Sequence, residues 1–466
     1  MAANNIMAQS SSDYDVLVVG AGPSGFGAAL SAATLGKRVL LIDRNAGPGG
    51  VAVFAGCPVF AGIDSFDGSV FGGMLAKLID ELAPDATIVG NTLTTTEDRI
   101  QLAMTRLLRS AGVEMLFYAT LTGVTRENDR IRDISAYCAG HNLTFTARNF
   151  VDATGDAVLS RLTNIPVIHG SPDETMTKTL FFKIIGVEHF DKSDLKKRFA
   201  EKCFPYPHQD NFMGTTLGHS NQLLLNLSAV SGDAADPWDL TRMDIELREQ
   251  IDVIVPWLRR EFPEFRHCEV VSVAPNIGVR ASCNIVALET IRCTDLDEDT
   301  PVAEPVAIGK RSYGEHYIKQ FSSPWQSNAG GFRSIPYGAL RTAAVSNLAA
   351  AGRCIGIESS AISAVRLMPV CIGTGQAAGF AAALDFPSYA KLREVMKAQK
   401  CVFAAEDFRK SNLKIDMESL NEIKKRSRKR PEIQSKSTPQ NGEYSYLSTL
   451  IKPNRRCTNV VPKITK

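Results

Sequence analysis

Residues 16–43 read VLVVGAGPSGFGAALSAATLGKRVLLID, and this stretch decides the fold. Two runs of four apolar residues, 16–19 and 39–42, predict strands that are buried on both faces of a parallel sheet. The alanine-rich segment between them predicts a helix that packs against that sheet. The stretch therefore predicts a strand, a glycine turn, a helix and a second strand, which is the opening unit of an α/β fold.

The glycine turn has GxGxxG spacing, formed by Gly20, Gly22 and Gly25. Gly20 permits a tight turn, Gly22 lets the backbone approach a pyrophosphate, and Gly25 lets the helix pack closely on the sheet. The helix N-terminus then presents free N–H groups and partial positive charge to the phosphates. Asp43, at the end of the second strand, is placed to accept hydrogen bonds from a ribose diol. Together these features predict a dinucleotide site, for NAD or for FAD.

Length and composition limit the class of protein. A chain of 466 residues is too long for one typical core, so two or three lobes are expected. Apolar residues at 44% and charged residues at 22% are ordinary for a soluble globular protein, and no apolar run reaches the length of a membrane helix. The ten cysteines include no CxxC pair, so reduced thiols and no metal centre are expected.

The net charge of +2 hides a difference between the body and the C-terminal end. Residues 424–466 contain 12 Lys and Arg against two Glu, so the rest of the chain is acidic overall. Nucleic acid is therefore not an expected partner of the body. The run KKRSRKR at 424–430 is typical of a solvated tail, with a nuclear address as the alternative. The protein is otherwise expected to be cytoplasmic, because residues 1–13 do not have the pattern of a signal peptide.

The order of these patterns predicts a Rossmann-like α/β domain, a parallel sheet flanked by helices, with an inserted α+β domain and a disordered basic tail. The predicted parts are a flexible arm over 1–13, the first part of the dinucleotide-binding domain over 14–164, a substrate or cap domain over 165–335, the closing part of the first domain over 336–390, a helical segment over 391–423 and the tail over 424–466.

Two longer helices are also predicted. Thr94 and Glu97 have capping-box spacing at the start of a helix over about 96–111. In the insert, apolar residues at helical spacing predict a helix over about 241–260, which Pro256 is expected to kink.

Several segments match one known family in their order and spacing. They are VVGAGPSGFGAALSAATLGKRVLLID (18–43), GPGGVA (47–52), NFVDATGDA (149–157), TRMDIELREQ (241–250), APNIGVRAS (274–282), IPYGAL (335–340), NLAAAGRCI (347–355) and AVRLMPVCIGTGQAAG (364–379). With these segments the chain resembles FAD-dependent oxidoreductases of the glutathione-reductase-type fold, in the branch related to fumarate reductase and succinate dehydrogenase flavoproteins. The resemblance covers roughly residues 14–385 and implies FAD as the cofactor.

The resemblance also implies a set of FAD-binding residues. Gly20, Gly22, Pro23, Ser24 and Gly25 would hold the pyrophosphate, Asp43 and Arg44 would flank the adenosine ribose, Gly50 and Val51 would lie along the path to the flavin, Leu121 would meet the adenine, Ala153, Thr154 and Gly155 would approach the adenosine half, Gly352 and Arg353 would contact the ribityl chain and pyrophosphate, and Gly373 and Gln376 would belong to the last FAD-binding segment.

The last matching segment predicts a helix start beside the flavin. Pro369 suits the first helical position, and a helix N-terminus stabilises negative charge on a reduced ring. Gly373, Gly375 and Ala377 would keep this helix thin enough to approach the ring. Arg366, just before the helix, would add a full positive charge near flavin or substrate, with an ion pair elsewhere as the alternative.

Two further residues are candidates for catalysis. Arg280 lies in NIGVRASCN, where the family commonly has further arginines but this chain has Ser282, Cys283 and Asn284. His316 is a candidate proton shuttle, because histidine as a residue type titrates near neutrality, although a lone loop histidine is more often solvated. Cys57 has no partner cysteine a few residues on, so buried filler is the favoured interpretation.

These observations predict an enzyme, an FAD-dependent oxidoreductase that transfers a hydride between a small organic substrate and flavin N5. A dehydrogenase or an oxidase, with a role in specialised metabolism, would fit. One alternative is a monooxygenase that uses NAD(P)H, although no second nucleotide fingerprint is present. Another is a non-catalytic flavin-binding redox sensor. The electron acceptor stays open between oxygen, NAD(P) and another carrier, and neither a metal nor a membrane is expected as a partner.

Overall fold

The computed structural model describes residues 14–61, 72–89, 92–170, 175–206, 211–218, 220–298, 300–310, 316 and 332–404. The arm predicted over 1–13 and the tail predicted over 424–466 lie outside the described residues. The part of the predicted C-terminal helical segment after residue 404 does too. Its beginning is helical, since α9 spans Tyr389–Ala398.

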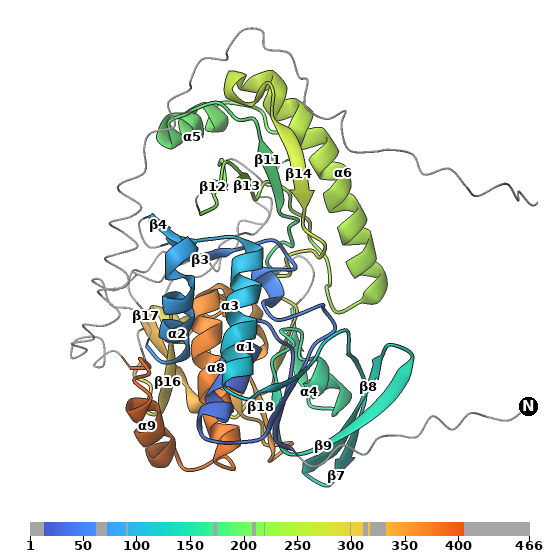
Figure 1. Cartoon of the computed structure of the whole chain (residues 1–466), viewed down its shortest axis with the longest axis vertical. Helices are drawn as coiled ribbons and strands as arrows, with labels where there is room; N and C mark the ends of the chain where they lie inside the picture. Colours follow the sequence, from blue (N-terminus) through green and yellow to red (C-terminus); the bar gives the residue numbers. More distant parts are fainter. Residues whose placement is uncertain are drawn as a thin grey trace, which may run out of the picture. The chain divides into compact units, whose positions relative to one another are not determined.

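A parallel sheet forms the centre of the dinucleotide-binding part (Figure 1). Its strands lie in the order β6 (Glu114–Leu116), β2 (Val39–Ile42), β1 (Tyr14–Val19), β9 (His141–Asp152) and β18 (Leu348–Ala350), and each neighbouring pair is parallel. The two strands predicted from the opening stretch are confirmed as β1 and β2, which pair in register from Val16 with Val39 to Val19 with Ile42. A parallel sheet of nearly continuous apolar strands requires cover on both faces.

The first half of β9 extends the sheet by antiparallel pairing. It pairs antiparallel with β8 (Arg130–Cys138), which in turn pairs antiparallel with β7 (Thr120–Glu127). Strand β9 therefore belongs both to an antiparallel meander, with β7 and β8, and to the parallel sheet. Residues of this meander close a core on one face of the sheet, together with short helix α4 (Val158–Leu162).

Helices cover the other face of the sheet. Helices α1 (Pro23–Thr34) and α8 (Met368–Ala383) lie directly on its strands, and α2 (Met74–Leu82), α3 (Glu97–Ser110) and α9 pack against these two helices. The short strands β3 (Val59–Ala61), β4 (Thr87–Val89) and β5 (Thr92–Thr94) form a small antiparallel sheet beside them. Together these elements bury one large apolar core with the sheet.

Helices α1 and α8 lie side by side and in backbone contact (Figure 1). A Cβ atom on Gly375 would overlap the carbonyl oxygen of Ser24, and one on Gly379 would overlap that of Ala28. Residue numbers rise together along the two helices, by four from Gly375 to Gly379 and by four from Ser24 to Ala28. The two helices therefore run parallel. Their N-termini therefore lie at the same end, which is also the end where β1 ends.

This packing shows what two of the small residues of α8 contact. Gly375 faces α1, and Gly373 lies near Ala307, with a Cβ–Cβ distance of 3.4 Å after a methyl is added. Gly375 thus permits a close contact with α1, and the approach of this helix to a ring stays a prediction. Pro369 is the second helical residue, because α8 begins at Met368.

The cap of α3 also differs from the expected one. The N-cap is Thr96, whose side chain accepts a hydrogen bond from the Arg99 N–H, and it is not Thr94. Thr94 is buried in β5, where its hydroxyl pairs with that of Thr87 at 2.8 Å. The capping-box spacing put the predicted cap two residues too early. It could not show that Thr94 is part of strand β5 and uses its hydroxyl there.

The insert has its own sheet and core. Strands β12 (Gly214–Thr216), β13 (Leu223–Leu225), β11 (Phe182–Ile185) and β14 (Glu269–Val273) pair antiparallel in that order. Helices α5 (Lys192–Ala200) and α6 (Pro237–Glu261) pack their apolar residues into the same core. The predicted apolar face of α6, from Met243 to Leu258, is buried there, and the helix continues through Pro256.

The core of the insert is narrower than the block predicted over 165–335. Its buried members lie between Leu180 and Ile277. Strands β10 (Val167–His169) and β15 (Cys283–Ile285) pair with each other and contact the core of the meander, while β16 (Pro305–Lys310) and β17 (Phe332–Pro336) join the large core under α8. Short helix α7 (Cys293–Asp297) also belongs to that large core. Of the helices in the described part of the chain, none is long and apolar enough to cross a membrane.

We expect Gly375→Ala to destabilise the fold by about 1–3 kcal/mol, because the added methyl must displace backbone of α1. Gly373→Ala is the matched control on the same helix, since its methyl meets only an ordinary contact and alanine favours the helix. Urea unfolding of both variants measures the difference. Equal stability of the two variants would contradict the packing of α1 against α8.

Candidate active site

A cavity of about 770 Å³ opens at the carboxyl ends of the parallel strands. The loops that follow β1, β2, β9 and β18 all contribute to its lining, with Gly20, Asp43, Ala153 and Arg353 as examples. The insert supplies another part of the lining, and the start of α8 a third. A crevice at this edge is where open α/β sheets bind their ligands.

The glycine loop between β1 and α1 has a backbone that other residues would not tolerate. Gly20 has φ of +99°, and a Cβ there would run into the Ala153 carbonyl. A Cβ on Gly25 would overlap the Gly20 carbonyl, so Gly25 allows α1 to sit directly on the loop. Gly22 faces the cavity, and a Cβ there would meet nothing closer than Gly50 at 3.8 Å. The loop therefore leaves free space for a ligand at Gly22.

Asp43 holds the glycine loop as well as facing the cavity. Its Oδ2 accepts a hydrogen bond from the Ala21 N–H at 2.6 Å, and its Oδ1 accepts from the Asn45 N–H at 2.7 Å. The Gly20 N–H meanwhile donates to the Ile42 carbonyl. The carboxylate predicted to bind a ribose is therefore also a structural tie between the end of β2 and the loop.

The start of α8 forms a separate wall of the cavity. Arg366, Leu367, Met368 and Cys371 line it. Because α8 is parallel to α1, both helices direct the positive ends of their dipoles toward the same space. The cavity is thus suited to anionic groups at two places, one at each helix N-terminus.

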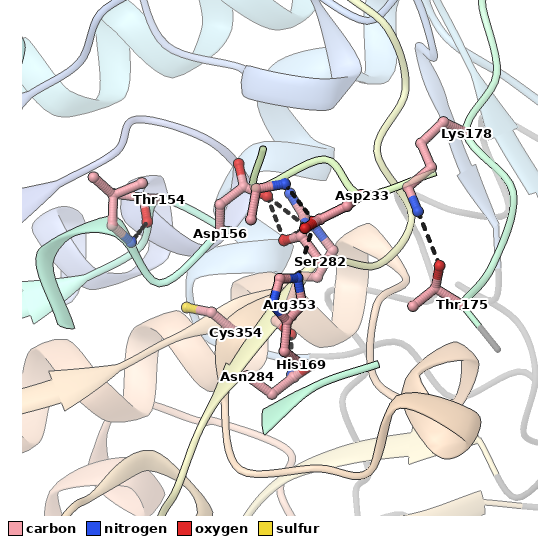
Figure 2. Close-up of polar contacts among 12 residues, drawn as sticks. Thr154, Asp156, His169, Thr175, Lys178, Asp233, Ser282, Asn284, Arg353 and Cys354 are labelled. Atoms are coloured by element: carbon pink, nitrogen blue, oxygen red, sulfur yellow. Dashed lines mark hydrogen bonds and ion pairs between the residues drawn. The ribbon is translucent and has the colours of Figure 1, made fainter. Parts of the chain in front are cut away.

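A charged cluster supports the cavity where β9 and β18 end (Figure 2). The Arg353 Nη1 lies 2.8 Å from Asp156 Oδ1 and donates to the Ser282 hydroxyl at 2.7 Å. The Ser282 hydroxyl itself lies 2.5 Å from Asp156 Oδ1. Burial opposes charge on Asp156, but Arg353 and the Ser282 hydrogen bond outweigh it, so the pKa of this carboxyl lies below its usual value.

This cluster joins segments that are far apart in the chain. Asp156 follows β9, Arg353 follows β18, and Ser282 precedes β15. The Asn284 side chain adds hydrogen bonds to the carbonyls of Arg353 and Ile355. The predicted role of Arg353 at the dinucleotide is therefore joined by a role in holding three loops together.

A second buried cation, Lys178, lies near this cluster without lining the cavity (Figure 2). Its ammonium donates to the Thr175 hydroxyl at 3.1 Å and to the Gly232 carbonyl at 2.5 Å. Burial and the neighbouring Arg353 lower its pKa to about 8, although Asp233 and Asp239 act in the opposite direction. Sequence reasoning did not find this lysine, because nothing in its local pattern distinguishes it from a surface residue.

Arg280 is the most deeply buried arginine on the cavity lining, with 9% of its surface exposed. Its guanidinium donates to the Thr177 carbonyl at 2.8 Å and to the Asn226 side-chain oxygen at 3.1 Å, both of which are neutral acceptors. Burial, together with the charge of nearby Arg366, lowers its pKa to about 9. Two predicted cations are therefore close neighbours in one cavity.

Two thiols also line the cavity. Burial raises the pKa of Cys57 to about 11, although Arg280 and Arg366 act in the opposite direction. Burial likewise raises the pKa of Cys371 to about 12. Both groups stay protonated at neutral pH, which does not suit a nucleophilic thiolate.

His316 lines the same cavity and has a left-handed backbone, with φ of 63°. Its carbonyl accepts hydrogen bonds from the N–H and the hydroxyl of Thr177. Thr177 also supplies the carbonyl that holds Arg280, so this threonine connects two of the predicted catalytic residues.

Most of the predicted site residues are brought together. The cavity lining includes Gly20, Gly22, Pro23, Ser24, Asp43, Arg44, Gly50, Val51, Leu121, Ala153, Thr154, Gly155, Arg353, Arg280, His316 and Arg366.

Four predicted residues do not line the cavity. Gly25 and Gly352 instead permit close contacts with Gly20 and Ser24. Gly373 lies further along α8, and the Gln376 side chain accepts a hydrogen bond from the N–H of Met74 at the start of α2. For these four residues the structure shows a packing role.

Sequence reasoning missed the side of the cavity that the insert provides. Its described members are Thr179, Phe181, Lys192, Lys196, Asn211, Phe212, Met213, Thr215, Leu224, Asn226, Asn276, Ile277 and Val279. They come from short strands and connections that carry no recognisable motif. Across the residues that the structure describes, no group of three or more His, Cys, Asp or Glu is placed to hold a metal ion.

Comparison with known proteins was made for the sequence and for the fold. A sequence model of the family described as FAD dependent oxidoreductase matches residues 15–405. Dihydrolipoyl dehydrogenase 3 of Pseudomonas aeruginosa is 31% identical over 149 residues, which are 30% of this chain and 30% of that protein. The aligned segment thus spans less than a third of the length of that curated relative.

Solved structures resemble the fold at low sequence identity. A geranylgeranyl bacteriochlorophyll reductase-like protein from Thermoplasma acidophilum has a TM-score of 0.45 at 13% identity, over 89% of this chain and 90% of that one. The glycerol-3-phosphate dehydrogenase from Bacillus halodurans, complexed with FAD, has a TM-score of 0.38 at 17% identity, over 58% and 57%.

Asp156→Asn should lower the free energy of unfolding by about 1–3 kcal/mol at neutral pH, because it leaves the Arg353 charge without its buried partner. The pKa of Asp156 is lower in the folded state, so its stabilising effect exists above the unfolded pKa and is lost as the pH falls through the folded one. The difference between variant and wild type should therefore shrink below about pH 4.

Urea titrations at several pH values measure this effect. Glu127→Gln, which removes an exposed pair with Arg132, is the control and should change stability far less. A stability loss for Asp156→Asn that did not depend on pH would count against the charged cluster.

Proposed function

This chain belongs to the FAD-dependent oxidoreductase family, and from that premise we propose that it is an enzyme that transfers a hydride between a small anionic organic substrate and FAD. The cofactor is FAD. The motif APNIGVRAS, which carries Arg280, supports a placement in the branch related to fumarate reductase flavoproteins. The observation that carries the proposal is the presence of Arg280 and Arg366 in the same cavity as the glycine loop.

The residues of the cavity fit this cofactor. The free space above Gly22 and the N-terminus of α1 suit a pyrophosphate, and Asp43 and Arg44 lie beside them on the lining. The second helix N-terminus, that of α8, lies on another wall of the same cavity. When bound, FAD supplies a two-electron acceptor or donor that exchanges a hydride with a substrate carbon at N5.

Arg280 and Arg366 would bind and orient the substrate. A buried guanidinium hydrogen-bonded to neutral acceptors, with a second guanidinium nearby, is costly unless a ligand supplies negative charge. A substrate carboxylate would offset the charge of Arg280 and would accept N–H groups from both guanidiniums in a fork-like geometry. The cost of keeping the two cations together therefore favours an anionic substrate.

His316 would hold or receive the proton that accompanies the hydride. Its side chain reaches the same cavity as the two arginines, and an imidazole titrates near neutral pH. The high pKa values of Cys57 and Cys371 do not support thiol chemistry as the alternative. In this assignment Arg280 and Arg366 position the substrate, while His316 holds or receives its proton.

Purified protein should be yellow and should release FAD on denaturation. Gly22→Asp should abolish FAD retention, because it puts a carboxylate where the pyrophosphate approaches the loop. Gly36→Asp is the control, since Gly36 lies outside the cavity lining and a Cβ there meets nothing within 4 Å, so its only expected cost is the strain of an aspartate at φ of +73°. Cofactor content is read from the visible absorption of desalted protein. A Gly22→Asp protein that kept its FAD would contradict this cofactor site.

Anaerobic mixing with a panel of small carboxylates tests the reaction itself. A substrate should bleach the visible flavin band, and Arg366→Gln should slow the bleaching by about a hundredfold without loss of FAD. Bleaching that required NADPH, with product formed only in the presence of oxygen, would show a monooxygenase instead. Failure of every reductant except dithionite would favour a redox sensor and would contradict the proposal.

A further inference from the structure

The lining of the cavity carries more positive charge than FAD and the Arg280–Arg366 pair account for. Among the described lining residues, six are cationic side chains and two are carboxylates: Arg44, Lys192, Lys196, Arg280, Arg353 and Arg366 against Asp43 and Asp156. Both carboxylates are engaged, Asp43 by the glycine loop and Asp156 by Arg353 and Ser282. Two lysines, Lys192 and Lys196, are thereby left outside the roles assigned above.

The lysines lie at a different end of the cavity from the arginines. Arg280 donates to Asn226, and the Asn226 N–H donates to the carbonyl of Met213. Phe212, the residue before Met213, contacts Phe199 of α5 with ring centroids 5.8 Å apart. The edge of the β12–β13 pair thus separates Arg280 from α5, on which both lysines are carried.

The side of the lining that the insert supplies has an apolar part, interspersed with Thr179, Asn211, Thr215, Asn226 and Asn276. Phe181, Phe212, Met213, Leu224 and Ile277 contribute to it. Such a surface favours the hydrocarbon body of a ligand, while the ends favour charged groups. The cavity therefore has the pattern of charge, apolar body and charge.

Lys192 and Lys196 lie one turn apart on α5, at spacing that puts both on one face. Both lysine side chains are exposed at the edge of the cavity, and desolvation together with the charge of Lys196 lowers the pKa of Lys192. The carboxylates closest in sequence are used elsewhere, since Asp191 caps α5 and Asp194 pairs with Arg198. Within the described residues neither lysine forms an ion pair.

We infer that the substrate is an elongated amphipathic dianion, with one anionic group at Arg280 and Arg366 and a second at Lys192 and Lys196. This inference rests on the proposed function, because it takes the arginine end as the reacting end. The two lysines then determine specificity: they select ligands long enough to reach α5 and charged at the far end. A shorter anion, or one that is neutral at its far end, binds only at the arginines.

Calorimetric titration of the oxidised FAD-bound protein tests this without turnover. The probes are adipate, suberate and sebacate, each compared with the monocarboxylate of the same carbon number, hexanoate, octanoate or decanoate. We expect the dicarboxylate of best length to bind about three- to tenfold tighter than its partner at low salt, as partly exposed ion pairs allow. Added salt should reduce this preference.

The double variant Lys192→Gln/Lys196→Gln should lose the preference and keep its affinity for the monocarboxylate. Lys197→Gln is the matched control, because Lys197 lies on the same helix and outside the cavity lining. Wild-type protein with no preference at any length, or a double variant that retains it, would overturn the inference. Loss of the preference in the control as well would overturn it too.

The outcome is separable from that of the proposed function. If the lysine variants behave as wild type while a carboxylate still bleaches the flavin, the inference falls and the hydride-transfer proposal stands. If the lysine-dependent preference is found but no compound bleaches the flavin, the dianion site stands as a binding site and the proposed reaction falls.

Discussion

The backbone contact between α1 and α8 is the constraint on which the rest of the site depends. It joins a helix near residue 23 to one that begins at Met368, and it works only because Gly375 and Gly379 leave room for the carbonyls of Ser24 and Ala28. Two parallel helices in such close contact start at the same level, so both N-termini reach one cavity. The glycine loop could form without α8, but it would then face solvent instead of a wall that carries Arg366 and Cys371.

Positive charge is handled in two physically different ways around this cavity. Arg353 is compensated by Asp156 and by the Ser282 hydroxyl, so its charge stabilises the structure by tying three loops together. Among the described residues, the hydrogen-bond acceptors of Arg280 are neutral and another guanidinium lies near it, so its buried charge costs stability. A compensated buried charge indicates a structural role, whereas an uncompensated one at a cavity surface indicates a ligand. This contrast separates two arginines that look alike in the sequence.

Local patterns predicted the opening unit well because short-range physics decides it. Continuous apolar strands, the GxGxxG loop and the acid at Asp43 each follow from neighbours in sequence, and β1, β2 and the Gly20 turn are found as expected. One local prediction was wrong. The cap of α3 was placed at Thr94, because spacing cannot show that a strand already uses that residue. The structure gives Gln376 a hydrogen bond from Met74 and places Gly373 beside Ala307, while their place at the cofactor stays a prediction.

The sequence by itself determined the class of the protein, an α/β dinucleotide-binding fold with FAD and an insert, and it predicted many of the residues that line the cavity beside the glycine loop. These features are written in contiguous segments, so propensity, periodicity and spacing suffice to find them. Only the tertiary structure decided which face of α8 meets α1, that Arg280 and Arg366 are neighbours, and that Lys192 and Lys196 share their cavity. Those facts depend on how segments hundreds of residues apart pack together, and packing of that kind leaves no local pattern in the chain.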